Sequence, residues 1–122
     1  MLLPTHLETV QAEYAAALQR APIDDDTRRA YSSRVRQYLA WLGAAAVDRD
    51  PLADPAGRDW ALRDYRAHLQ SVAKRKPSTI NTTLAAIADF YIRRGLGPPD
   101  VRRLELPQSA PRALAPRVLR IL

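Results

Sequence analysis

The residues best suited to chemistry in this chain lie in the segment 74–81, which reads KRKPSTIN. Three consecutive cations precede Pro77, a residue that breaks a helix, and the next helix is expected to begin at Ser78. Ser78 or Thr79 can cap that next helix by accepting a hydrogen bond from its first backbone amides. The remaining free amides and the positive end of the helix dipole then point outward beside the cations. The segment therefore predicts an anion site, and its natural ligand is a phosphate backbone.

The side chains of this segment differ in what each can contact on a nucleic acid. The cations at positions 74–76 can reach phosphates, and the two hydroxyl groups that follow Pro77 are short donors near a groove. Asn81 and Thr82 can face base edges, although Asn81 can equally stabilise the first turn of the helix. The predicted DNA-binding residues of this region are Lys74, Arg75, Lys76, Ser78, Thr79, Asn81 and Thr82.

Positive charge is concentrated in the second half of the chain. Residues 1–70 hold nine Lys or Arg and ten Asp or Glu, whereas residues 71–122 hold ten and three, within a net charge of +6. A basic half of this kind attracts polyanions, of which nucleic acid is the commonest. An ordinary soluble surface is the alternative, because 17 of the 19 cations are arginine.

Residue types that other functions need are missing or isolated. The chain has no cysteine, and His6 and His68 lie 62 positions apart, so we expect no metal site and no cofactor. No apolar run reaches the roughly 18 residues of a membrane span, and the first residues lack a signal-peptide pattern. We therefore expect a cytoplasmic protein without membrane contact. The five tyrosines lie on apolar stripes and are expected in the core.

Helical periodicity accounts for most of the chain. Apolar residues recur every three or four positions in four stretches that are separated by proline or glycine. No alternation of period two is sustained, so no strand competes with this interpretation. The expected helices span residues 5–20, 24–42, 58–73 and 78–95. The sequence therefore predicts an all-α fold class, a small four-helix bundle.

Local signals set the ends of these helices. A carboxylate of the triplet Asp24–Asp26 can cap the second helix. Two prolines and a glycine indicate a loop over residues 48–57. The third helix is then expected to begin near Arg58 and to bury Trp60 and Val72 with its other apolar side chains.

The composition changes after Gly95. Residues 96–122 contain five of the ten prolines, which is typical of an extended, semi-rigid linker. Residues 116–122 resemble the first turn of a helix whose packing partner lies elsewhere. The predicted organisation is a helical domain over residues 1–95 and a linker over residues 96–122 that leads into the truncated start of a C-terminal domain.

A family resemblance rests on several of these features taken in order. It extends over residues 24–114, and its matching positions are Thr27, Tyr31, the stretch YLAWL at 38–42, Asp54-Pro55, Ser78–Asn81, Leu84, Ile87, Phe90, Tyr91, Leu106-Pro107 and Pro111–Leu114. Together they resemble the N-terminal core-binding domain of tyrosine recombinases, the phage-integrase family. The resemblance implies a SAM-like, orthogonal four-helix domain that clamps one face of duplex DNA.

The resemblance also implies where catalysis takes place. In this family the cationic groups that activate the phosphate and the nucleophilic tyrosine lie in a separate C-terminal domain, so this chain is not expected to be an enzyme by itself. The implied partners are double-stranded DNA and other recombinase protomers, with this chain itself monomeric. Because the family also places the second helix against DNA, Arg28 and Arg34 are secondary candidates, and pairing with the acidic residues 24–26 is the alternative for them.

Two functional classes follow from the sequence. The leading hypothesis is a DNA-binding module for site-specific recombination or integration, which predicts salt-sensitive binding to duplex DNA. The alternative is a helical protein-interaction module whose basic tail meets an acidic partner, which predicts an exposed apolar patch and no preference for duplex DNA. An autonomous enzyme has no constellation of residues to support it.

Overall fold

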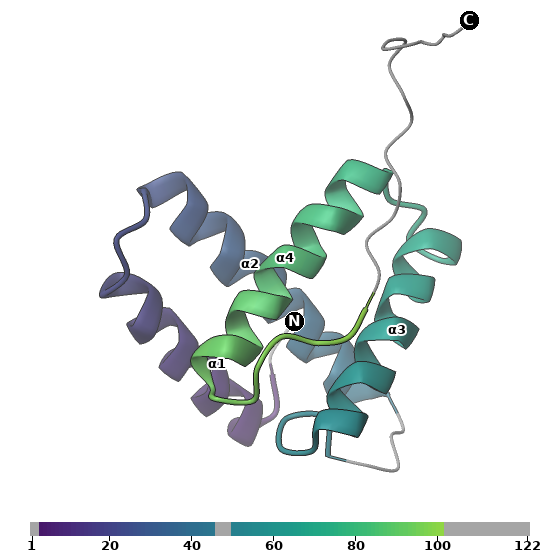
Figure 1. The fold of residues 1–122 in the computed structure, drawn as a ribbon, viewed down its shortest axis with the longest axis horizontal. Coiled ribbons are helices and arrows are strands. Elements are labelled where there is room, and N and C mark those ends of the chain that lie inside the picture. Colours follow the sequence, from purple (N-terminus) through teal and green to yellow (C-terminus); the bar gives the residue numbers. More distant parts are fainter. Residues whose placement is uncertain (1–2, 46–49, 102–122) are drawn as a thin grey trace, which may run out of the picture.

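The computed structural model describes residues 3–45 and 50–101, and within them it contains four α-helices and no strand (Figure 1). The all-α fold class is therefore confirmed. None of these helices combines the length and the apolar character that crossing a bilayer requires. The part of the expected linker over residues 102–122 lies outside the described residues. The helices are α1 (Thr5–Gln19), α2 (Asp25–Ala44), α3 (Pro55–Ser71) and α4 (Pro77–Arg93).

Helices α2 and α4 form the centre of the bundle. They make its most extensive contact, while α1 packs mainly on α2 and α3 packs mainly on α4. Figure 1 shows α4 crossing α2, with α1 and α3 on opposite sides of the crossing. Tyr38 of α2 and Tyr91 of α4 are both fully buried, with ring centroids 6.2 Å apart. The core therefore lies between these two helices, and the outer pair closes it from the sides.

Carboxylate caps begin two of the helices. The Asp24 side chain accepts from the Thr27 amide at 2.7 Å, which confirms the predicted cap of α2. Asp54 accepts from the Gly57 amide at 3.2 Å, and Pro55 occupies the first position of α3. The expected start near residue 58 is therefore wrong, because the Asp-Pro pair begins a helix instead of lying in a loop.

The expected burial of Trp60 and Val72 is also wrong, since the two residues are 54% and 71% exposed. The buried face of α3 passes through Ala61, Tyr65 and Leu69. Trp60 precedes that stripe by one residue, which rotates its side chain by about 100° around the helix axis. Val72 lies beyond the last residue of α3 and therefore beyond the face that meets α4.

The chain turns back after α4. Gly95 and Gly97 have φ values of 86° and 82°, in the left-handed region that favours glycine. The amide of Leu96 donates to the carbonyl of Tyr91 at 3.0 Å and so closes the end of the helix. Residues 94–101 then cross from the end of α4 to α3 (Figure 1). The described start of the expected linker is thus packed against the bundle.

Candidate nucleic-acid interface

The turn between α3 and α4 has a backbone that is held by hydrogen bonds. The amide of Ala73 donates to the carbonyl of His68 at 3.0 Å, and the amide of Arg75 donates to the carbonyl of Leu69 at 2.9 Å. Lys74 has a φ of 52°, in the left-handed region that side chains other than glycine seldom adopt. These bonds hold the turn in one shape despite that conformation.

We call residues 74–76 of this turn the basic turn. All three side chains are exposed, and none takes part in an ion pair within residues 3–45 and 50–101. Elsewhere in the described structure, seven arginines lie 2.5 to 3.7 Å from a carboxylate oxygen; they are Arg28, Arg29, Arg36, Arg58, Arg63, Arg93 and Arg94. The basic turn therefore concentrates positive charge that no neighbouring carboxylate cancels.

The first turn of α4 adjoins the basic turn. Its N-cap is Lys76, which makes no side-chain capping bond, so the expected cap by Ser78 or Thr79 is wrong. Pro77 takes the first helical position and moves both hydroxyl residues inside the helix. The first amide to bond within the helix is that of Ile80, which donates to the Lys76 carbonyl at 3.0 Å. At the start of a helix the first backbone amides have no acceptor within the helix. In α4 these are the amides of residues 78 and 79, which can therefore donate to an outside acceptor.

The polar side chains of α4 separate into exposed and partly buried positions. Ser78 and Thr82 are exposed and one turn apart, and the Thr82 hydroxyl donates to the Ser78 carbonyl at 2.9 Å. Thr79 and Asn81 are half-buried. Of the four predicted side chains in this helix, Ser78 and Thr82 therefore present the more accessible face beside the basic turn.

Arg28 lies in the first turn of α2, and Figure 1 shows the start of α2 far from the turn between α3 and α4. Its guanidinium donates to the carbonyl of Leu18 at 3.0 Å and to that of Ile23 at 2.9 Å, and it pairs with Asp25 at 2.5 Å. The side chain is only 18% exposed. Its donors thus close the end of α1 against the start of α2, and the structure does not bring Arg28 together with the other candidates.

Arg34, in contrast, is related to the basic turn by Tyr65, because the charges of Arg34 and Arg75 both act on that residue. Tyr65 is buried in α3 and packs against Tyr38, which follows Arg34 by one helical turn. Burial raises the pKa of Tyr65, and the charges of Arg34 and Arg75 both oppose that increase. Two guanidinium groups, from α2 and from the basic turn, therefore act on one phenol. Arg34 is thus close enough to Tyr65 for its charge to act on the same phenol as that of Arg75.

The tyrosines have structural partners. Tyr14, Tyr38, Tyr65 and Tyr91 are buried, as the apolar stripes predict, and Tyr31 is half-buried against the core. The Tyr14 hydroxyl donates to the Asp89 carboxylate at 2.8 Å, and burial together with this bond raises the pKa of Tyr14. The four buried phenols, whose pKa values are all raised by burial, are therefore neutral components of the core at neutral pH.

No protein-family model, no curated protein and no solved structure matches this chain. The class of protein is therefore defined by the fold and the surface alone. It is a small four-helix bundle in which an exposed, backbone-constrained basic turn adjoins the open amino-terminal end of a central helix.

Proposed function

We propose that this chain is a DNA-binding domain that holds duplex DNA for a site-specific recombinase of the tyrosine recombinase, or phage-integrase, family. One observation carries the proposal: the three exposed cations of the basic turn have no acidic partner among the described residues, whereas seven arginines elsewhere are paired. Such a surface attracts a polyanion. The resemblance to the core-binding domain supports duplex DNA as that polyanion and recombination as the process.

The proposed contacts follow from the position of each group. The side chains of the basic turn and of Arg34 bind phosphates as cations, and the free amides at the start of α4 hold one phosphate oxygen at the positive end of the helix dipole. Ser78 and Thr82 face the groove with their exposed hydroxyls, while Thr79 and Asn81 add contacts from the same turn. Most of these contacts are to the backbone of DNA, so the domain clamps DNA more than it reads sequence.

In this proposal the breaking and rejoining of DNA belongs to a separate C-terminal domain. The buried phenols of this chain support that division, because a nucleophilic tyrosine needs access to the phosphate and a neighbouring base. The proposed partners are duplex DNA and other recombinase protomers, in the cytoplasm.

The proposal is tested by replacing Lys74, Arg75 and Lys76 together with alanine. Each phosphate contact contributes a slope of about 0.9 in the dependence of log K on log salt, so losing three lowers the slope by about 2.7. Between about 50 and 200 mM salt, the affinity of the unchanged protein should therefore fall about 40-fold more than that of the variant. Fluorescence anisotropy with a short labelled duplex measures both quantities.

A matched control removes the same charge from another part of the surface. Arg20, Arg29 and Arg36 are replaced together with alanine, since Arg20 follows the end of α1 and the other two belong to α2. We expect the control to lower the salt slope by less than about 1. It weakens the overall positive potential of the protein but removes none of the proposed phosphate contacts. Equal effects of the two triple variants would refute a specific role for the basic turn.

The alternative, a protein-interaction module with a basic tail, requires a contiguous apolar patch. Among the described residues, the large exposed apolar side chains are those of Trp60, Val72 and Ile92, and the first two lie about 18 Å apart along the axis of α3. Trp60 and Val72 are therefore too far apart to belong to one small patch. Competition separates the two functions: heparin displacing the chain from duplex as effectively as unlabelled duplex of equal charge would favour the alternative.

A further inference from the structure

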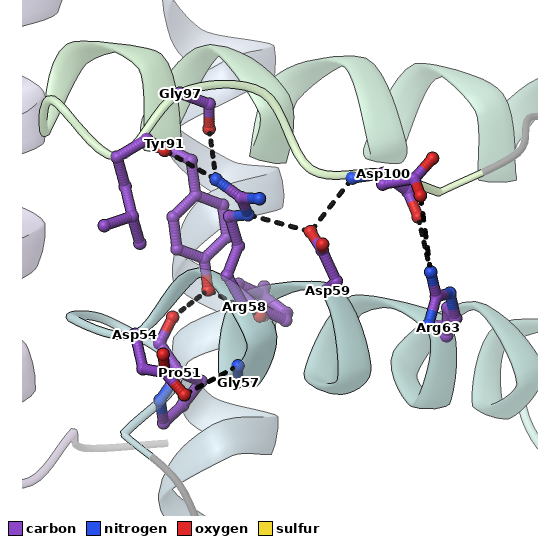
Figure 2. A network of polar contacts seen from close by, with 11 residues as sticks. Pro51, Asp54, Gly57, Arg58, Asp59, Arg63, Tyr91, Gly97 and Asp100 are labelled. Atoms are coloured by element: carbon purple, nitrogen blue, oxygen red, sulfur yellow. Dashed lines mark hydrogen bonds and ion pairs between the residues drawn. The ribbon is translucent and has the colours of Figure 1, made fainter.

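The segment that follows α4 is bound to α3 by three charged side chains (Figure 2). Arg58 donates from Nη1 to the carbonyls of Leu96 and Gly97, at 2.5 and 3.2 Å. Asp59 accepts from the amide of Asp100 at 2.9 Å. We call residues 95–101 the strap. These contacts join positions about 40 residues apart in sequence, so they belong to the tertiary fold.

Almost all of these contacts are to the backbone of the strap. Arg63 also donates to the carbonyl of Asp100, at 3.1 Å, and only its 3.7 Å contact with the Asp100 carboxylate involves a side chain of the strap. Leu96 and Val101 add apolar contact, because both pack against the core. The outer face of α3 therefore holds this peptide in a defined, extended path.

The strap supplies two of the hydrogen-bond acceptors of the Arg58 side chain. Its side chain is 10% exposed, and besides the Asp59 carboxylate at 2.8 Å its acceptors are the two carbonyls of the strap. A buried guanidinium that loses acceptors carries a large desolvation penalty. Release of the strap would therefore remove two of the three acceptors of Arg58, which favours the docked state.

The Asp59 carboxylate binds both the Arg58 side chain of α3 and the backbone of the strap. Burial alone would raise its pKa, but hydrogen bonds from Arg58 and from the amide of Asp100, together with the charges of Arg58 and Arg63, lower the pKa below its ordinary value. Its carboxylate thus remains charged at neutral pH. One oxygen, Oδ1, accepts from the Arg58 side chain and from the strap backbone at the same time.

We propose that the strap fixes the point at which the chain leaves the helical domain, and that Arg58 and Asp59 are the positioning residues that hold it there. The chain after Val101 then starts beside the middle of α3 instead of swinging from the end of α4. Seven released residues could otherwise reach up to about 23 Å from that end. Docked, the exit lies near Arg63, which is about 12 Å along α3 from Ser71, the last residue of that helix.

This positioning does not depend on the proposed DNA binding, and its test needs no DNA. The full chain is prepared with Asp59→Ala, and amide exchange and backbone order parameters are measured by NMR. In the unchanged protein we expect the strap amides to have order parameters near those of the helices, about 0.85. In the variant they should fall below about 0.6, and the Asp100 amide should exchange at least about tenfold faster, while the helices stay protected.

Asp64→Ala is the matched control, because it removes the same charge from an exposed position of the same helix. It should leave the Asp100 amide unchanged. A second variant, Asp100→Pro, deletes the amide donor without touching α3, and its Gly97 and Val101 amides should become mobile even if Asp59→Ala impairs folding. Mobile strap amides in the unchanged protein, or equal exchange in the Asp59 and Asp64 variants, would overturn the proposal.

Discussion

Two buried tyrosine hydroxyls form a chain whose direction can be deduced. The Tyr91 hydroxyl lies 2.7 Å from the carbonyl of Pro51 and 2.8 Å from the Tyr38 hydroxyl (Figure 2 shows the first contact). A carbonyl only accepts, so the single hydroxyl proton of Tyr91 is donated to Pro51. Tyr38 must therefore donate to Tyr91. This order makes the two hydroxyls unequal, although both residues are fully buried.

The order sets the cost of removing each hydroxyl. Tyr91→Phe breaks both bonds and leaves the Tyr38 hydroxyl and the Pro51 carbonyl buried without partners, which at about 1–3 kcal/mol each costs about 2–6 kcal/mol. Tyr38→Phe removes one bond and leaves the Tyr91 proton in use, which costs about 1 kcal/mol. The double variant leaves only the carbonyl unpaired, so we expect it to be more stable than Tyr91→Phe alone.

Urea unfolding followed by circular dichroism measures these free energies. Tyr31→Phe is the control, because Tyr31 is half-buried and none of the hydrogen bonds within the described residues uses its hydroxyl; we expect a change within about 0.5 kcal/mol. The reasoning would be refuted if Tyr38→Phe cost as much as Tyr91→Phe, or if the two costs added in the double variant.

Two further predictions concern alkaline pH and Arg28. Burial raises the pKa of four tyrosines, that of Tyr91 to about 12, so their neutral forms stabilise the fold below about pH 10 and the stabilisation is lost as the pH rises. At up to about 1.4 kcal/mol per pH unit for each group, helix content should vanish together with the appearance of tyrosinate absorbance from these four residues; ionisation of any of the four in an intact helical protein would contradict this. Arg28→Met should lower stability by about 2–3 kcal/mol and leave the salt slope of DNA binding unchanged, whereas a slope reduced by about 1 would return Arg28 to the interface.

The helices were predictable because their signals are local. Apolar spacing and the Asp24 cap indicate α2, and Pro77 marks the start of α4. The start of α3 was missed because Asp54-Pro55 resembles a loop until the aspartate is recognised as a cap for the Gly57 amide. Trp60 was also expected in the core with the other apolar side chains of this helix, although the stripe that faces the core passes through the neighbouring Ala61.

The candidate site was predictable only in part. The cations of the basic turn are adjacent in sequence, so their exposure together is a local property. The sequence left open whether the second helix uses its arginines for DNA or for the acidic triplet, and the structure pairs Arg28 with Asp25 and Arg29 with Asp26. The strap could not be found this way, because Arg58 meets Leu96 only after α3 and α4 have packed.

The size of the basic turn limits what it can contribute to DNA binding. Three consecutive residues span about 7 Å between their first and last Cα atoms, whereas phosphates of one DNA strand follow each other at about 3.4 Å along the helix axis. The turn can therefore serve only two or three neighbouring phosphates, which bounds its share of the salt slope at about 2.7. Phosphates look alike on every sequence, so any discrimination by this surface has to come from the polar side chains at the start of α4, among which Ser78 and Thr82 are the more exposed. A substitution at either hydroxyl that weakened binding equally on all duplexes would therefore mean that α4 meets the backbone and not a groove.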